Sequence, residues 1–271
     1  MILVTGASGQ LAQAILQHLS QAGCEAIGGT RRPGDDPHLR LLDFDDPATL
    51  NFGDVDTLVI VSAGTAEDDV VVARHENVIA AAERGNVQHI IYTSLADGGD
   101  HLGFALAHRW TEQRLKRCTI PWTILRNGLY AELIGQLLAP ESGAITAPFG
   151  HGRVAAIARQ DLADAASLVA QDPQPHAGRT YNLVGTRAIS ALEVADEVGA
   201  IYRPGTLGDL RRSLNTAGLL PFQPAMLLSI HAAVAHGFLD GTTDDIAQLL
   251  GRAPRDPLTV AAAVAQGAGS R

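Results

Sequence analysis

The first half of the chain alternates between two patterns of hydrophobic positions. One is a short, nearly continuous apolar run, such as TLVIVSA from Thr57 to Ala63, which is typical of a strand buried on both faces. The other repeats apolar residues every three or four positions, as in QLAQAILQHL from Gln10 to Leu19, and predicts an amphipathic helix. By these criteria we expect strands at Ile2–Thr5, Glu25–Thr30, Leu39–Phe44, Thr57–Ala63, His89–Ser94 and Trp122–Arg126, and helices at Gln10–Leu19, Asp69–Arg84 and Leu106–Arg117.

Strand and helix follow one another with short turns, and this order predicts an α/β fold. The expected architecture is a doubly wound parallel sheet of Rossmann type with helices on both faces. After residue 126 the alternation breaks down, because residues 127–152 are rich in Gly and Pro and the chain from residue 190 is helical with Pro interruptions. We expect residues 1–126 to form the Rossmann domain, with sheet-completing returns near residues 153–185. Residues 127–271 are expected to form mainly a smaller C-terminal lobe that covers the carboxyl ends of the strands, where ligands bind in such sheets.

Composition narrows the class of protein. The chain has 271 residues and a formal net charge of -9, which argues against a nucleic-acid-binding surface. It contains no apolar run of about 18 residues, and its opening MILVTGAS lacks the basic region of a signal peptide. Cys24 and Cys118 stand far apart without a CxxC partner, as in a reducing compartment. We therefore expect a soluble cytoplasmic protein that contacts neither nucleic acid nor membrane.

A glycine-rich turn, GASGQLA, joins the first strand to the first helix. In this position Gly6 allows a tight turn, Gly9 lets a pyrophosphate approach the backbone, and the small Ala12 lets the helix pack against the strand. The alternative is an ordinary turn that binds no ligand. We expect a dinucleotide to contact the residues of this turn and of the first helical turn, namely Gly6, Ala7, Ser8, Gly9, Gln10 and Leu11.

The end of the second strand indicates which dinucleotide binds. NAD-binding sites place Asp or Glu there to accept from the ribose 2′-hydroxyl, but this strand ends GGTRRPG without an acid. Arg31 and Arg32 together offer guanidinium donors for a 2′-phosphate, which favours NADP(H) over NAD(H); the alternative is a solvated turn. Further contacts are expected where the next two strands end, at Asp43 and Phe44 for the adenine, and at Ser62, Ala63 and Gly64 for the ribose and pyrophosphate.

Two other groups of side chains predict no chemistry of their own. Ser94 and His108 are not expected to form a hydrolase pair, because the GxSxG elbow is absent and no motif places an acid to orient the histidine. His231 and His236 are five residues apart and lie on different helix faces, so we expect no metal site.

The stretches VTGASGQLA, HENVIAAAERGNVQHIIYTSL, HRWTEQRLKRCTIPWTILRNGLYAE and TTDDIAQLLGRAP occur in this order along nearly the whole chain. Together they resemble the NmrA-like family of atypical short-chain dehydrogenases/reductases, most closely the bacterial type 2 NAD(P)H:quinone oxidoreductases. The resemblance implies a Rossmann domain that binds NADPH, with Thr93 of YTSL among the cofactor contacts, and a small C-terminal lobe that closes a cleft for a quinone.

The chain departs from ordinary short-chain dehydrogenases at the Tyr-x-x-x-Lys pair that transfers a proton to a carbonyl. If Glu112 is aligned with the glutamate that follows this pair, the lysine position falls on His108 and the tyrosine position on Phe104. Phe cannot donate a proton, so the usual alcohol–ketone chemistry is in doubt. The quinone reductases of the family also lack this tyrosine.

A quinone accepts hydride readily and needs positioning more than a strong acid. We therefore expect direct hydride transfer from nicotinamide to a quinone, without flavin. Asn127, Gly128 and Tyr130 are expected to line the nicotinamide and quinone pocket, and Tyr130 to stack on the ring or donate to an oxygen. His108 is expected to contact the nicotinamide ribose or deliver a proton, on the assumption that its pKa lies near neutrality. Packing is the alternative role for each, and the weaker candidates are Phe149 and His151.

Two further hypotheses about the function stay open from the sequence. One is a non-catalytic NADP(H)-binding redox sensor that acts through a protein partner. The other is a reductase of a different electron-poor substrate, such as a phenolic or nitroaromatic compound. A homodimer is a possible assembly for each.

Overall fold

The computed structural model describes residues 1–63 and 66–269, and these residues fall into two compact units. Unit 1 consists of Met1–Leu95, Leu106–Arg126 and Leu162–Tyr181, and unit 2 of Ala96–Ala105, Asn127–Asp161 and Asn182–Arg271. Our sequence-based division at residue 126, as a division between cofactor and substrate binding, stays a prediction.

A seven-stranded sheet has the order β3-β2-β1-β4-β5-β6-β9. Neighbouring strands from β3 through β5 pair in parallel, and the order reverses between β1 and β4, the switch point at which open α/β sheets bind ligands. The predicted α/β, doubly wound fold class is confirmed. The strands are β1 (Ile2–Thr5), β2 (Ala26–Thr30), β3 (Leu39–Leu41), β4 (Thr57–Val61), β5 (His89–Leu95), β6 (Trp122–Asn127) and β9 (Arg179–Leu183).

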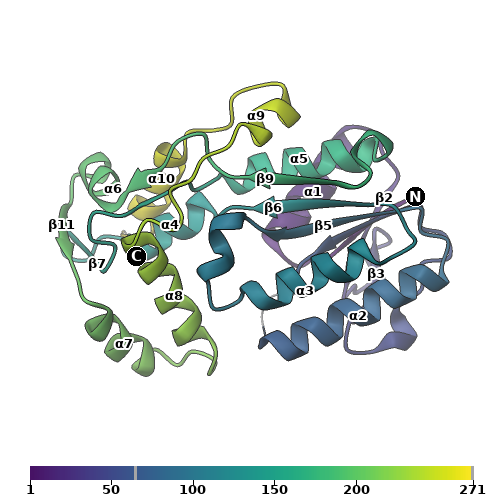
Figure 1. Ribbon diagram of the computed structural model, residues 1–271, viewed down its shortest axis with the longest axis horizontal. Helices are drawn as coiled ribbons and strands as arrows, with labels where there is room; N and C mark the ends of the chain where they lie inside the picture. Colours follow the sequence, from purple (N-terminus) through teal and green to yellow (C-terminus); the bar gives the residue numbers. More distant parts are fainter. Residues whose placement is uncertain (64–65, 270–271) are drawn as a thin grey trace. The chain divides into compact units, whose positions relative to one another are not determined.

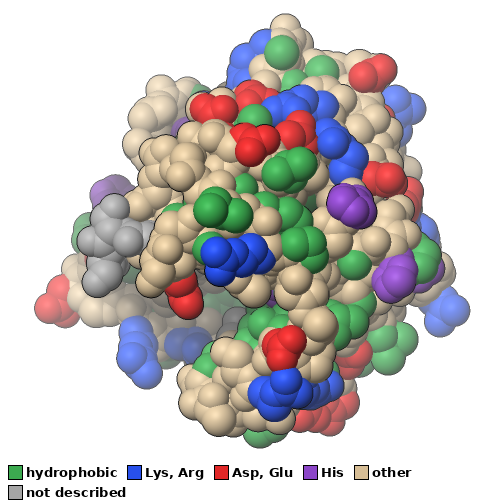
Figure 2. Space-filling model, turned by 90° about the vertical axis from the view of Figure 1, so that its left-hand side faces the viewer, with side chains coloured by type: hydrophobic (Ala, Val, Ile, Leu, Met, Phe, Trp, Pro, Cys, Tyr) green, Lys and Arg blue, Asp and Glu red, His purple; other side chains and the backbone are tan. Residues whose placement is uncertain are grey.

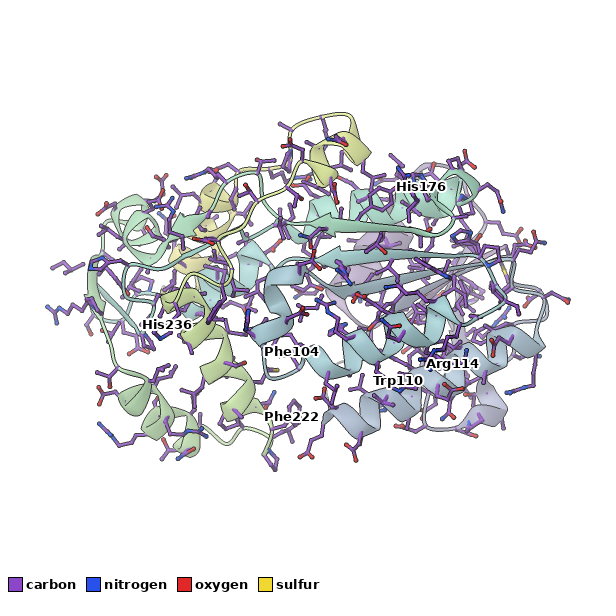
Figure 3. The ribbon with its side chains drawn as sticks, viewed as in Figure 1. Phe104, Trp110, Arg114, His176, Phe222 and His236 are labelled. Carbon is purple, nitrogen blue, oxygen red and sulfur yellow. The ribbon has the colours of Figure 1, made fainter. Side chains whose placement is uncertain are left out.

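Helices flank this sheet on both faces. The helices α2 (Asp68–Arg84) and α3 (Ala105–Lys116) lie side by side on one face, and α1 (Gln10–Gln21) lies behind the strands in Figure 1. Arg114 of α3 joins the first two, since it donates to Glu76 and Glu83 of α2; its position on α3 is labelled in Figure 3. On the opposite face His18 of α1 pairs at 2.7 Å with Asp164 of α5 (Arg159–Gln171).

Apolar side chains from both faces of the strands make the core of unit 1. β5 is buried along its whole length, as its continuous apolar run predicts, and Leu58, Ile60, Ile90 and Tyr92 lie in one cluster. This core fixes the strand ends, and therefore the loops that follow them, in one arrangement.

Two strands end earlier than their apolar patterns predict. β3 stops at Leu41 rather than Phe44, because the backbone turns at Asp43, whose side chain accepts from the Asp45 N–H. β4 stops at Val61 rather than Ala63. Beyond Val61 the backbone N–H groups donate to side chains and no longer to carbonyls of a neighbouring strand. The Ser62 N–H donates to the Thr93 hydroxyl, and the Ala63 N–H donates to the His75 ring.

Unit 2 contains short strands and several helices. In it β7 pairs in parallel with β11, and β8 pairs antiparallel with β10, so the predicted helical C-terminal region also holds strands. Figure 2 shows a face of the molecule on which hydrophobic side chains lie among acidic and basic ones. The remaining elements are α4 (Ala131–Leu137), β7 (Ala144–Ala147), β8 (Arg153–Val154), β10 (Ile189–Ser190), α6 (Ala191–Val198), β11 (Ile201–Pro204), α7 (Leu207–Thr216), α8 (Gln223–Ala235), α9 (Asp245–Leu250) and α10 (Pro257–Gly269).

Within the described ranges, no helix has the length and apolar character needed to cross a membrane.

Candidate nucleotide site

A cavity of about 350 Å³ opens at the ends of β1, β2 and β4 in unit 1. Eight of the predicted cofactor residues line it: Gly6, Ser8, Gly9, Arg31, Asp43, Phe44, Ser62 and Ala63. Six more lining residues are new: Gly29, Thr30, Leu42, Asp45, Val61 and Arg74. The predicted Gly64 lies outside the described residues.

The turn between β1 and α1 forms one end of this cavity. Gly6 has a φ of +68°, which favours glycine, and its carbonyl accepts from the Gly9 N–H at 2.8 Å. A Cβ on Gly9 would lie 3.2 Å from that carbonyl oxygen, closer than side chains normally approach. Gly9 is the N-cap of α1 and makes no side-chain capping hydrogen bond, and the first turn of α1 holds no acid. The backbone N–H groups of that first turn are therefore available to an anion.

Three other predicted residues of the turn do not line the cavity. The Ala7 side chain is buried and its N–H donates to Gly29 at 3.0 Å, so Ala7 ties the turn to β2. Leu11 packs in the core beside Ala12, which is fully buried, as the small-residue position requires. Gln10 begins α1 and is exposed.

The charged residues that line the cavity are Arg31, Asp43, Asp45 and Arg74, and together we call them the charged wall. Arg74 of α2 donates from Nε and Nη2 to both carboxylate oxygens of Asp45, at 2.8 and 2.7 Å. The hydrogen bonds and the charge of Arg74, together with the charge of Arg31, hold the pKa of Asp45 below its usual value. Nothing in the sequence analysis singled out Arg74 or Asp45. The signals available were that Asp45 follows Asp43 and Phe44 and that Arg74 lies in the helix after β4.

The loop after β4 is held by buried hydroxyl and imidazole groups. Thr93 Oγ1 accepts from the Ser62 N–H at 3.1 Å, so Thr93 orients the loop and does not line the cavity. Ser62 Oγ is buried beside the cavity and has no hydrogen-bond partner among the described residues. An unsatisfied buried hydroxyl costs stability, and a bound ribose or pyrophosphate would supply its partner.

His75 links this loop to α3. Thr111 donates its hydroxyl proton to the Ala107 carbonyl at 2.7 Å, so its oxygen accepts from His75 Nδ1–H at 2.8 Å. His75 Nε2 is then the acceptor for the Ala63 N–H, at 3.1 Å. Burial lowers the pKa of His75 to about 3, so this neutral tautomer is the form present at pH 7. His75 was not among the residues predicted from the sequence.

His108 does not have the near-neutral pKa that the sequence analysis assumed. Burial, together with the charge of Arg109, lowers its pKa to about 4, and its Nδ1 lies 2.9 Å from the Tyr92 hydroxyl. Burial also raises the pKa of Tyr92, so both groups are neutral at pH 7. His108 is therefore neutral near pH 7 and can act there as a hydrogen-bonding group.

Glu112 is the buried carboxylate next to this pair. It accepts from Ser94 at 2.6 Å and from the guanidinium groups of Arg109 at 2.9 Å and Arg126 at 2.8 Å. Burial opposes its charge, but the hydrogen bonds from Arg126 and Ser94 and the two positive charges outweigh burial and lower the pKa of Glu112. Its charge is satisfied by three fixed donors, which makes it a structural anchor for α3, β5 and β6.

The predicted substrate residues lie in unit 2. Asn127 Oδ1 is buried without a hydrogen-bond partner in the part of the chain described, and the Gly128 N–H donates to Leu183 at 2.8 Å. The Tyr130 ring lies 4.9 Å from the Arg159 guanidinium, and burial raises the pKa of its hydroxyl, which is therefore protonated. The weaker candidates differ, since Phe149 packs 5.0 Å from His231 whereas His151 is exposed.

Residues 6–173 match a family described as NAD(P)H-binding. The chain belongs to this NAD(P)H-binding family. Quinone oxidoreductase 2 of Escherichia coli (strain K12) is 30% identical over 271 residues, which cover 93% of this chain and 94% of that protein. The NmrA-like resemblance read from the sequence is confirmed.

Two solved structures of NAD(P)H-binding relatives share the fold over nearly the whole length. The NADPH-dependent quinone oxidoreductase of E. coli in complex with NADPH gives a TM-score of 0.86 at 27% identity, covering 97% of this chain and 99% of that one. The triphenylmethane reductase of Citrobacter sp. in complex with NADP(H) gives 0.85 at 28% identity, covering 96% and 98%.

The residues of unit 1 fit the NAD(P)H cofactor of this oxidoreductase family. The uncapped first turn of α1 suits a pyrophosphate, Ser62 Oγ lacks a partner in the described structure, and Arg31 lines the same cavity. Across the described ranges, His, Cys, Asp and Glu form no group of three that could hold a metal ion.

Proposed function

We propose that the chain is an NADPH-dependent oxidoreductase that transfers hydride directly to a quinone, without flavin. The observation that carries the proposal is the similarity to E. coli quinone oxidoreductase 2, which extends over nearly the full length of both chains. Phe104, at the position of the usual catalytic tyrosine, adds support because a quinone needs no strong acid to accept hydride.

The charged wall of the cavity supports NADPH as the reductant. Arg31 lines the cavity and no acid ends β2, so a 2′-phosphate would gain a guanidinium donor there. The remaining predicted contacts (Gly6, Ser8, Gly9, Asp43, Phe44, Ser62 and Ala63) would hold the rest of the adenosine diphosphate half. Gly64, Thr93, Asn127 and Gly128 stay cofactor predictions.

The cofactor, when bound, supplies a hydride, that is two electrons and one proton. The reduced quinone then needs one more proton to become a hydroquinone. Tyr130 is protonated at neutral pH and is our candidate to donate to the quinone oxygen, and Asn127 offers an unpartnered amide oxygen to orient a ring. His108 would act only as a neutral hydrogen-bonding group.

The test is NADPH oxidation, followed at about 340 nm, with a benzoquinone and a naphthoquinone as acceptors. We expect quinone-dependent turnover that prefers NADPH over NADH and that loses most of this preference in Arg31→Ala. The matched control is Arg32→Ala, because Arg32 is the adjacent exposed arginine but does not line the cavity. Tight NADPH binding without turnover on any quinone would refute the enzyme and leave the redox-sensor reading.

We also propose, from the sequence, a cytoplasmic location and a homodimeric assembly.

A further inference from the structure

The Arg74–Asp45 pair lies in the cavity in which Arg31 is proposed to bind a 2′-phosphate. Both residues line the cavity that also contains Arg31. The pair is bidentate, and its members come from different elements, Arg74 from α2 and Asp45 from the segment after β3. Arg74 is mostly buried, with 19% of its side chain exposed, whereas half of the Asp45 side chain faces solvent. An exposed carboxylate in a nucleotide cavity is in a position to repel a phosphate.

The charges on this wall balance. Arg31 and Arg74 contribute two positive charges and Asp43 and Asp45 two negative ones. Both arginines interact with Asp45, since each of them lowers the pKa of its carboxyl group. A 2′-phosphate brings a charge near -2, which Arg31 alone would have to hold against two carboxylates. With Arg74 present, the charge of Asp45 is offset and the repulsion is reduced.

We propose that the Arg74–Asp45 pair sets the choice between NADP(H) and NAD(H), with Arg74 masking an acid that would otherwise favour the 2′-hydroxyl. This inference rests on the proposed binding of the 2′-phosphate near Arg31. The two residues of the pair are unequal: Asp45 is the one that acts on the 2′-phosphate bound by Arg31, and Arg74 acts by neutralising Asp45. Arg74 is therefore a specificity residue that works largely through another side chain.

The experiment measures binding of NADPH and NADH to the full-length protein by the change in their fluorescence. For Arg74→Ala we expect NADPH affinity to fall roughly tenfold, because the Asp45 carboxylate would then repel the 2′-phosphate, with NADH affinity within about twofold. For Asp45→Asn we expect NADPH affinity equal to or above that of the wild type. The decisive variant is Arg74→Ala/Asp45→Asn, in which NADPH affinity should return to within about threefold of the wild type.

Adenosine 2′,5′-bisphosphate and adenosine 5′-monophosphate, used as competitors, place the effect at the adenosine end. The double variant should restore binding of the bisphosphate, and the monophosphate should change little in any variant.

The chain provides a matched control pair. Arg40 donates to both carboxylate oxygens of Asp54 at 2.8 and 2.6 Å, with similar exposure, but neither residue lines the nucleotide cavity. Arg40→Ala and Asp54→Asn should leave the NADPH/NADH ratio unchanged.

Equal loss of NADPH and NADH binding in Arg74→Ala, or failure of the double variant to recover, would overturn the proposal and leave the pair a structural tie between α2 and β3. The readout is separate from the reaction. A protein that shows this binding pattern but reduces no quinone would contradict the proposed function and leave the specificity assignment standing.

Discussion

The nucleotide residues of unit 1 and the substrate residues of unit 2 are held in different ways. In unit 1 the turn at Gly6 and Gly9, the uncapped start of α1 and the loop at Ser62 surround a cavity with unused hydrogen-bonding capacity. In unit 2 Tyr130 already packs against Arg159 and Phe149 against His231. Backbone groups and charges thus prepare the first site, whereas packing contacts hold the aromatic rings of the second, in which the Asn127 amide oxygen also has no partner among the described residues.

Because of this difference, we expect some substitutions to change NADPH affinity and others to change the free energy of unfolding. A change in the turn of unit 1 removes a binding surface without removing a core contact. A change at a buried polar group of unit 2 removes a structural tie. Four predictions test this separation, and they run from the largest expected free-energy change to the smallest.

The largest effect is expected from Asp161→Asn in unit 2. Asp161 is fully buried and accepts from Arg252 at 2.8 Å and from the side chain and N–H of Arg255 at 2.6 and 2.7 Å. Asparagine at this fully buried position would face the donors of Arg252 and Arg255 with its own NH2 group, which should lower the free energy of unfolding by about 3 kcal/mol, as measured by urea denaturation. NADPH affinity should change by less than about twofold, since neither Asp161 nor its arginine partners line the nucleotide cavity.

The control for this variant is Asp209→Asn, which breaks an exposed pair with Arg212 in the same unit and should cost less than about 0.5 kcal/mol. A large loss of NADPH affinity in Asp161→Asn, at a temperature where the protein stays folded, would show that the two kinds of site are not separable.

The second effect is expected from Gly9→Val in unit 1. The added side chain would crowd the Gly6 carbonyl and block the approach of a phosphate to the first turn of α1. NADPH affinity should fall roughly 100-fold, about 2.7 kcal/mol, in isothermal titration calorimetry. Gly241→Ala is the control, because a Cβ there meets no atom within 4 Å. Unchanged binding in Gly9→Val would argue that this turn holds no phosphate.

A smaller effect is expected from Tyr130→Phe. If the hydroxyl donates to the reduced quinone, kcat should fall about tenfold, which corresponds to about 1.4 kcal/mol, with the NADPH Kd unchanged. The ring stays over Arg159 in this variant, so the packing role is preserved. Full activity in Tyr130→Phe would assign Tyr130 to packing alone.

The mildest expected effect is a loss of stability in acid that is concentrated in unit 1. Burial lowers the pKa of His75 to about 3 and of His89 and His108 to about 4, and all three lie in unit 1. Below pH 6.5 these histidines take up protons in the unfolded state but not in the folded one. Because three groups act together, the free energy of unfolding should fall by about 1 kcal/mol as the pH drops from 7 to 6.5, and more steeply below that.

Tryptophan fluorescence reports this transition in unit 1 specifically, because both tryptophans of the chain, Trp110 and Trp122, belong to that unit. A pH-independent unfolding midpoint between pH 7 and 5 would contradict the buried, neutral state of these histidines.

The sequence predicted the parts of the site that depend on local geometry. Gly6, Gly9 and Arg31 follow strands whose apolar runs are unambiguous, and a turn after a strand has few conformations open to it. The strand order follows from the alternation of elements, which leaves few ways to build the sheet.

The parts that depend on contacts distant in sequence were not predicted. Arg74 is 29 residues from Asp45, and the apolar period of α2 gives its buried face but not the partner of an arginine. The pKa of His108 was wrongly predicted because it depends on burial against Tyr92 and on the charge of Arg109. Such values come from packing, which a linear pattern does not contain.

The hydrogen bonds of His75 have one more consequence. Its Nδ1 proton is enclosed between α2 and α3, and its Nε2 accepts from the loop that follows β4. A ring proton so shielded exchanges slowly with water and gives a resolved signal in nuclear magnetic resonance. Because the same ring contacts the Ala63 N–H at the cavity wall, that signal would shift when a nucleotide enters, and His75 is thus a natural spectroscopic reporter of occupancy.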